Sequence, residues 1–225
     1  MKFYYSIFPL ALFLCYQINL KAQTVVDYYQ LLADYDDDIK LHAIYKEGDQ
    51  WYTNGVDDKK QAITVDEKNN YLELKDKEIN GIFTLEVSVL KKADGENLVA
   101  VVKNHLDIFL HGEIHILKFR NGRWSDITES VMPNITYKDF TEQSLSLAAS
   151  AFNPALNHHL EFGFQLPKKG STVLALMQTQ ILKERCANND NSVREYCASL
   201  SEISYSSVDL NWDAKNGKFV IGKRQ

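Results

Sequence analysis

The sequence predicts a mainly β protein at the margin of α+β, with a helix at its N-terminus and a disulfide-clipped helical insertion late in the chain. Apolar and polar residues alternate through several short runs between residues 45 and 130. Turn dipeptides separate these runs, and two cysteines lie close together in the second half. In the run 82–90, Phe83, Leu85 and Val87 alternate with polar residues, which is typical of an antiparallel strand buried on one side.

The first 22 residues have the composition of a cleaved secretory signal. Lys2 gives a basic start and Ile7–Cys15 is a mostly apolar run. The run is too short to span a bilayer comfortably, and small Ala22 precedes Gln23 at the expected cleavage point. We therefore expect an exported mature chain, secreted or periplasmic, without a transmembrane segment.

The mature chain should begin with a helix over 24–34. Thr24 and Asp27 have the spacing of a capping box, and apolar or aromatic residues follow at helical intervals. Strands are expected next, and the clearest are Tyr71–Lys75, Ile82–Leu90, Leu98–Lys103 and Glu113–Phe119.

Tight turns between the strands are indicated by glycine dipeptides. Asp94-Gly95 and Asn121-Gly122 have the residue types that adopt positive φ in hairpins. His111-Gly112, between two apolar runs, is interpreted as a third two-residue hairpin loop.

The second half of the mature chain repeats the pattern of the first. The stretch 87–100 aligns with 164–175, and 114–124 aligns with 208–219. Each of the latter two ends in an aromatic residue that follows Asn-Gly and one basic residue. We expect two antiparallel four-stranded repeats related by pseudo-twofold symmetry, 23–133 with the N-terminal helix and 134–225, packed as one unit. Generic hairpin composition is the alternative explanation.

The second repeat should contain the helical insertion. Residues 173–186 suit either a helix or a strand followed by a loop, and 191–200 suits a short helix. Cys186 and Cys197 lie within this stretch and bound the loop 186–197, and a disulfide is the expected state in an oxidising compartment. A catalytic or metal-binding thiol pair would be expected to show CxxC spacing or a nearby histidine, and neither is present.

Composition disfavours several functions. The net charge is −5 without a concentrated Lys/Arg stripe, which argues against nucleic acid as a partner. The chain has 10 glycines and no phosphate-binding glycine loop, no Gly-x-Ser-x-Gly and no His-Glu-x-x-His, so no cofactor is expected. Catalysis by residues assembled from distant positions stays possible.

The stretch around residue 113 contains a candidate metal set. On a strand, His111, Glu113 and His115 would share one face, as in a two-histidine, one-carboxylate site. The competing interpretation is a hairpin in which His111 occupies the turn and His115 lies at the edge of the core.

Aromatic residues near the first strands suggest a ligand surface. Trp51, Tyr52 and Tyr71 lie close in sequence, and aromatic rings with polar tips can line a sugar or peptide groove. An amphipathic margin of the core is the alternative.

The segment 121–133 carries Asn-Gly-x-Trp-x-Asp-Ile-Thr followed by Val-x-Pro. It resembles a segment of uncharacterised secreted bacterial proteins, which implies export and supplies no catalytic residue. The expected function is a secreted or periplasmic, non-enzymatic binding protein of the bacterial envelope, with a protein or a glycan as partner. The alternatives are a hydrolase of envelope polymers and a metal-dependent enzyme using His111, Glu113 and His115.

Overall fold

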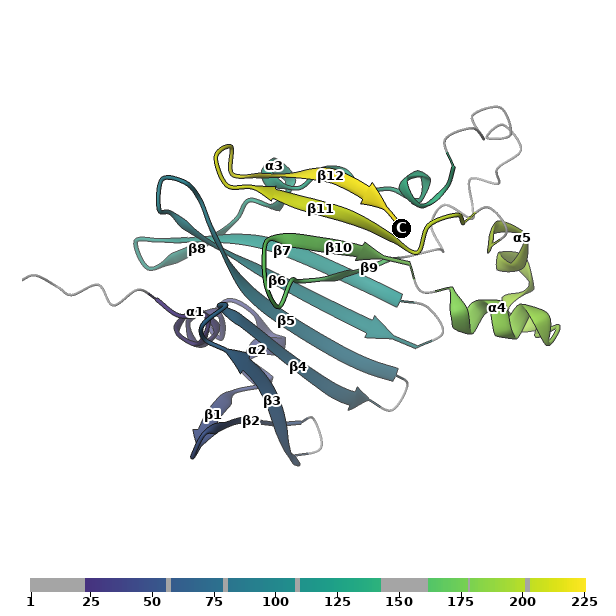
Figure 1. Cartoon of the computed structure of the whole chain (residues 1–225). Helices are drawn as coiled ribbons and strands as arrows, with labels where there is room; N and C mark the ends of the chain where they lie inside the picture. The colour runs from purple at the N-terminus through teal and green to yellow at the C-terminus, as the bar shows by residue number, and fades with distance from the viewer. Residues whose placement is uncertain are drawn as a thin grey trace, which may run out of the picture.

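The computed structural model describes residues 23–55, 58–78, 81–107, 110–142, 162–177, 179–200 and 203–225. Within these ranges twelve strands form two antiparallel sheets, one of eight strands and one of four (Figure 1). The prediction of a mainly β fold with an N-terminal helix and a late helical insertion closed by a disulfide is confirmed. The predicted signal peptide, residues 1–22, lies outside the described residues.

The large sheet is a simple meander in which every strand pairs with the next along the chain. Its strands are β1 (Ile44–Glu47), β2 (Gln50–Asn54), β3 (Lys60–Asp66), β4 (Tyr71–Glu78), β5 (Gly81–Lys91), β6 (Asn97–Leu106), β7 (Leu110–Arg120) and β8 (Arg123–Asp126).

The small sheet has the order β12-β11-β10-β9 and covers one face of the large sheet. Its strands are β9 (Gly163–Gln165), β10 (Thr172–Leu176), β11 (Ser207–Asp213) and β12 (Lys218–Arg224). Side chains from β4–β7 and from all four small-sheet strands form the core between the sheets; they include Leu98, Ala100, Ile116, Phe164, Val173, Val208 and Phe219.

Two helices cover the opposite face of the large sheet. They are α1 (Val25–Leu32) and α2 (Asp37–Leu41), and their apolar side chains pack on Leu72, Leu85 and other residues of β3–β7. The predicted capping box is present, with Thr24 and Asp27 bonded reciprocally. The molecule therefore has three layers: helices, large sheet and small sheet.

The central strands are buried on both faces, which corrects one prediction. In β5 the residues expected to face solvent include Glu86 and Ser88, and both are buried toward the small sheet. The continuous apolar run in β6, from Leu98 to Val102, has the same cause, because one face meets the helices and the other meets the small sheet.

Two of the three predicted hairpin turns are confirmed. Gly95 and Gly122 have φ of +89° and +75° in the connections that follow β5 and β7. The prediction for His111-Gly112 is wrong, because both residues lie inside β7 and pair with His105 and Asn104.

Gly112 serves a close approach of the two sheets. A Cβ atom at Gly112 would lie 2.3 Å from the Cα of Gly163 in β9, well inside van der Waals contact. The glycine therefore lets the two backbones cross where any side chain would hold them apart.

The segments aligned in sequence each belong to an antiparallel hairpin. The β5–β6 hairpin corresponds to β9–β10, and the β7–β8 hairpin corresponds to β11–β12. The latter two each carry an aromatic cross-strand pair: Phe119–Trp124 with ring centres 4.8 Å apart, and Trp212–Phe219 with ring centres 5.0 Å apart. The large sheet has four further strands, so the duplication and its pseudo-twofold symmetry stay a hypothesis.

Both indoles of these pairs also join layers. Trp124 Nε1 donates to the carbonyl oxygen of Leu31 in α1 at 3.1 Å, and so connects the helices to the large sheet. Trp212 Nε1 donates to the carbonyl oxygen of Lys91 in β5 at 3.1 Å, and so connects the small sheet to the large one.

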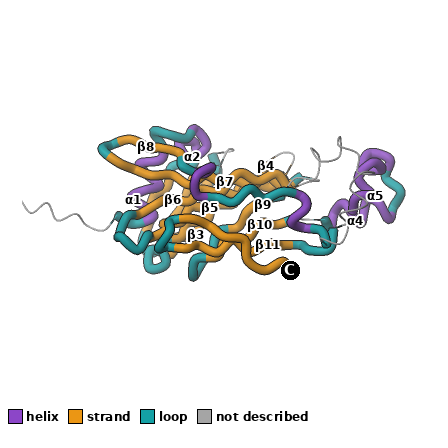
Figure 2. Tube along the Cα trace, turned by 90° about the horizontal axis from the view of Figure 1, so that it is seen from above, coloured by secondary structure: helices purple, strands orange, loops and turns teal. Residues whose placement is uncertain are grey.

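The insertion combines the two alternatives left open for 173–186. The stretch supplies strand β10 and then helix α4 (Gln180–Ala187), which is followed by a 3-10 helix, η4 (Asn191–Tyr196), and by α5 (Cys197–Leu200). These helices lie at one end of the molecule, far from α1 and α2 (Figure 2). The remaining short helices among the described residues are α3 (Thr128–Val131) and η1 (Tyr137–Phe140). No helix in the described ranges combines the length and apolarity needed to cross a membrane.

Candidate functional site

The three predicted ligand-binding aromatic residues do not form one site. Trp51 and Tyr52 are neighbours on β2 and so point to opposite faces of the sheet. Trp51 pairs with Ile63 and packs on the core beneath the helices. Tyr71 is fully buried in the other core, between the sheets. Tyr52 is left on the second face of the sheet, where Tyr45 of β1 pairs with it.

Tyr45 and Tyr52 are the centre of an open surface, here called the Tyr45–Tyr52 face, which also includes Glu47, Asn54 and Lys60. The two tyrosine rings are stacked, with centres 6.0 Å apart and an interplanar angle of 29°. The Tyr45 hydroxyl donates to Asn54 Oδ1 at 3.3 Å. Lys60 Nζ lies 3.9 Å from the centre of the Tyr52 ring. The face thus combines aromatic rings with hydroxyl, amide and charged groups.

Strand order explains why this face is open. The small sheet packs on β4–β7, and β1–β3 extend beyond it (Figure 1). Ala62 of β3, which pairs with Tyr52, is exposed, and Tyr45 and Tyr52 belong to neither large hydrophobic cluster. The tyrosines are therefore half-buried by each other and by their neighbours rather than by a covering layer.

The charges on the Tyr45–Tyr52 face balance. Lys60 forms an ion pair with Glu47 across the strands, and this hydrogen bond raises the pKa of Lys60 above its ordinary value. A neutral surface with stacked rings and several hydrogen-bonding groups suits an uncharged ligand rich in hydroxyl groups better than an anionic polymer.

The candidate metal residues all lie on β7. Glu113 is exposed, and its Oε2 is 3.7 Å from Nε2 of His115. The other ring nitrogen of His115 is 2.7 Å from Asp126 Oδ2, and His111 lies 3.8 Å from Asp107. The described residues contain no group of three His, Cys, Asp or Glu side chains arranged to hold a metal ion. The metal-dependent alternative stays a prediction.

His115 and Asp126 form a fixed pair on the helix-covered face of the large sheet. Burial opposes ionisation of Asp126, but hydrogen bonds from Thr128 and His115 outweigh it and lower the pKa of Asp126. The ionised carboxylate of Asp126 accepts a hydrogen bond from His115 Nδ1.

A small cavity adjoins His115. Its volume of about 30 Å³ has room for a water molecule and not for a substrate, and it is lined by Leu32, Tyr35, Asp36, Ile39, Val101, His115 and Leu117. This size favours a structural role for the His115–Asp126 pair.

Sequence reasoning missed a pair of buried carboxyl groups between the sheets. Glu73 of β4 and Glu86 of β5 are direct cross-strand partners, and they are 7% and 3% exposed. Burial raises the pKa of Glu86 to about 7. Burial acts the same way on Glu73, but hydrogen bonds from Lys168 and Lys75 prevail and lower its pKa. No sequence signal marked this pair, because Glu73 and Glu86 occupy the polar positions of alternating runs, as in strands with one solvated face.

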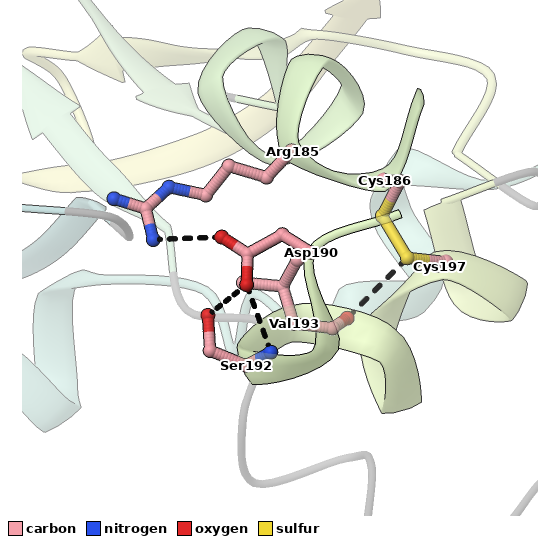
Figure 3. Close-up of a disulfide and its surroundings, with 6 residues drawn as sticks. All are labelled: Arg185, Cys186, Asp190, Ser192, Val193 and Cys197. Atoms are coloured by element: carbon pink, nitrogen blue, oxygen red, sulfur yellow. Dashed lines mark hydrogen bonds and ion pairs between the residues drawn. A yellow bond between two sulfur atoms is a disulfide. The ribbon is translucent and has the colours of Figure 1, made fainter. Parts of the chain in front are cut away.

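The disulfide closes the helical insertion (Figure 3). Cys186 and Cys197 are joined, with Cα atoms 5.7 Å apart. Asp190, between them, accepts hydrogen bonds from the backbone nitrogen and the hydroxyl of Ser192, and its other oxygen lies 3.4 Å from Arg185 (Figure 3). Leu182, Val193 and Leu200 form a small core, and both cysteines pack against it. These contacts favour a structural role for the disulfide.

Comparison with known proteins supports the fold and gives no activity. No family model and no curated protein matches the chain. A solved structure, a domain of an uncharacterised protein from Porphyromonas gingivalis W83, is similar with a TM-score of 0.52 and 12% sequence identity. The match covers 82% of this chain and 81% of that one. At this identity the chain shares the fold of that domain.

Proposed function

We propose that this chain is a secreted or periplasmic, non-enzymatic binding protein of the bacterial envelope that recognises a glycan through the Tyr45–Tyr52 face. The observation that carries the proposal is a stacked tyrosine pair on a part of the sheet that neither the helices nor the small sheet covers. The disulfide fits an oxidising compartment, and the signal-like residues 1–22 support export.

A glycan fits this face for chemical reasons. The apolar faces of sugar rings stack on tyrosine rings, and sugar hydroxyls pair with phenol, amide and carboxylate groups. Asn54, Glu47 and the two phenols provide donors and acceptors around the rings. A protein partner recognised on the same face would be the other outcome of a binding search.

Binding of the mature chain to a panel of soluble polysaccharides and peptidoglycan fragments tests the proposal. Tyr52→Ala should weaken binding of the recognised glycan about two- to tenfold, since stacking on one ring contributes about 0.5–1.5 kcal/mol. Tyr35→Ala is the matched control, because Tyr35 is an exposed tyrosine, 46% accessible, on the helix side of the sheet. Equal affinity of the Tyr52 variant and the wild type would refute the assignment of this face.

One observation favours the hydrolase alternative, namely the Glu73–Glu86 pair with pKa values moved apart, as acid and base roles require. The connection after β9 covers the pair, and Leu166 N–H donates directly to Glu86 at 2.6 Å. Release of reducing ends from envelope polymers, abolished by Glu86→Gln, would establish this alternative.

For the metal-dependent alternative, elemental analysis of the purified mature protein is decisive. A transition-metal content well below one per chain would remove it.

A further inference from the structure

Four polar residues lie in the core between the sheets, in two adjacent cross-strand pairs. Tyr71 pairs with Ser88, and Glu73 pairs with Glu86. All four are buried, and Tyr71 is not exposed at all. Two acidic side chains directly opposite each other repel when both are ionised, and a low-dielectric environment strengthens that repulsion.

The segment that follows β9 supplies the contacts over this cluster. The backbone N–H of Leu166 donates to Glu86 Oε2 at 2.6 Å, and Lys168 Nζ donates to Glu73 Oε2 at 2.8 Å. Lys75 of β4 takes the other oxygen of Glu73, also at 2.8 Å. Glu73 therefore has two ammonium partners, whereas Glu86 has one neutral amide.

The Tyr71 hydroxyl is a further buried polar group beside the two carboxyl groups. It is buried and has no hydrogen-bond partner among the described residues. Burial raises the pKa of Tyr71, and the charges of Glu86 and Glu73 raise it further, so the phenol lies within the field of both carboxyl groups. It stays protonated throughout the ordinary pH range.

The two carboxyl groups consequently titrate differently. Burial raises the pKa of Glu86 to about 7, with Glu73 as a further cause, while the amide of Leu166 and the charges of Lys75 and Lys168 act in the opposite direction. On β6 the residue paired with Glu86 is the uncharged Val102. At mildly acidic pH the pair carries one negative charge, and above neutral pH it carries two.

We propose that Glu86 is a proton-dependent latch that holds the segment 163–168 of the small sheet against the large sheet. With Glu86 protonated, the single carboxylate of Glu73 has Lys168 and Lys75 as its ammonium partners, and the segment is closed. Loss of the proton places a second charge in the same buried space, and the segment loosens to admit water to it. The two hydrogen bonds that Asn104 exchanges with Phe164, at 2.7 and 3.0 Å, hold β9 on β6 in the closed state.

The sign of the effect follows from the raised pKa. A carboxyl group with a higher pKa in the folded state than in the unfolded state binds more protons when folded. Its contribution to stability is present at low pH and is lost as the pH rises through the folded value, here toward about 7. The latch thus closes in acid and opens above neutrality.

Hydrogen–deuterium exchange of the mature protein at pH 5.5 and 8.5 tests the latch, with rates corrected for intrinsic exchange. Corrected exchange in 163–168 should be at least tenfold faster at pH 8.5, while β2 should not change. Glu86→Gln keeps an acceptor for Leu166 N–H and removes the titration, so this segment should be equally protected at both pH values. Glu129→Gln, at an exposed position on α3, is the matched control and should behave as wild type.

A second variant separates the latch from simple damage to the core. Glu73→Gln removes the charge beside Glu86 and leaves Glu86 itself in place. The pH at which exchange of 163–168 is half-way between its slow and fast rates should therefore move to a lower value. Protection of 163–168 that is independent of pH in the wild-type protein, or an unchanged pH dependence in Glu86→Gln, would overturn the proposal.

Discussion

Gly112→Ala should destabilise the protein through contact between the two sheets. The new Cβ would lie 2.3 Å from the Cα of Gly163 and 2.6 Å from Asn104 Oδ1. The first of these atoms is backbone and cannot rotate away, so β7 and β9 must separate. The separation needed to restore ordinary contact is about 1 Å or more.

The expected loss of stability in Gly112→Ala has two destabilising parts. Overpacking of this kind costs about 1–3 kcal/mol. Displacement of Asn104 also breaks its two hydrogen bonds to Phe164, each contributing about 1 kcal/mol. The entropy that alanine removes from the unfolded chain returns only about 0.4–1 kcal/mol. We therefore expect a net loss of about 2–4 kcal/mol.

Urea denaturation followed by fluorescence and circular dichroism measures this loss. Gly95→Ala is the control, because Gly95 has φ of +89° and no atom within 4 Å of a built Cβ. Gly95→Ala should lose only the stability that the left-handed backbone costs an alanine, about 1–2 kcal/mol. If Gly112→Ala costs no more than Gly95→Ala, the close approach of the sheets is not what requires glycine at this position.

Three further changes have defined outcomes. Cys186→Ser opens the disulfide loop and should lower the free energy of unfolding by about 3 kcal/mol, measured by denaturation with and without reductant, with no further effect of reductant on the variant. Asp126→Asn should reduce stability at neutral pH and abolish the part of the stability that is lost as the pH falls, because a lowered pKa contributes stability only above it; denaturation between pH 3 and 7 measures this. Trp124→Phe removes the bond to the Leu31 carbonyl and should cost about 1–2 kcal/mol, while preserving the far-ultraviolet spectrum of the sheets.

Local patterns were sufficient to predict most of the elements. The helix at 24–34 follows from its capping box, and the hairpins at Gly95 and Gly122 follow from dipeptides that adopt positive φ. The disulfide follows from two cysteines in a chain whose sequence predicts export. Each of these features is determined by residues that are neighbours in sequence.

What could not be predicted depends on contacts between distant parts of the chain. Glu86 and Ser88 alternate with apolar residues as in a solvated strand, and only the small sheet, about 80 positions later at Leu166, buries them. The need for glycine at position 112 could not be predicted for the same reason, since its close neighbour Gly163 belongs to the other sheet. No local pattern carries this information.

The candidate site was predictable in part. Tyr52 was among the selected aromatic residues, and its adjacency to Trp51 already implied that the two face opposite ways. Pairing of Tyr45 with Tyr52 requires the register of the β1–β2 hairpin, and burial of Tyr71 requires the small sheet. Neither is visible from composition.

The three tryptophans report on different contacts of the fold. Trp124 is bonded to α1, Trp212 joins the small sheet to β5, and Trp51 of β2 packs on the core beneath the helices. Variants that keep one indole at a time would therefore record separately the release of the small sheet, at Trp212, and of the helices, at Trp124. Detachment of one layer before the others would then be visible as an emission change at a single indole, which makes the order of disassembly a measurable property of this chain.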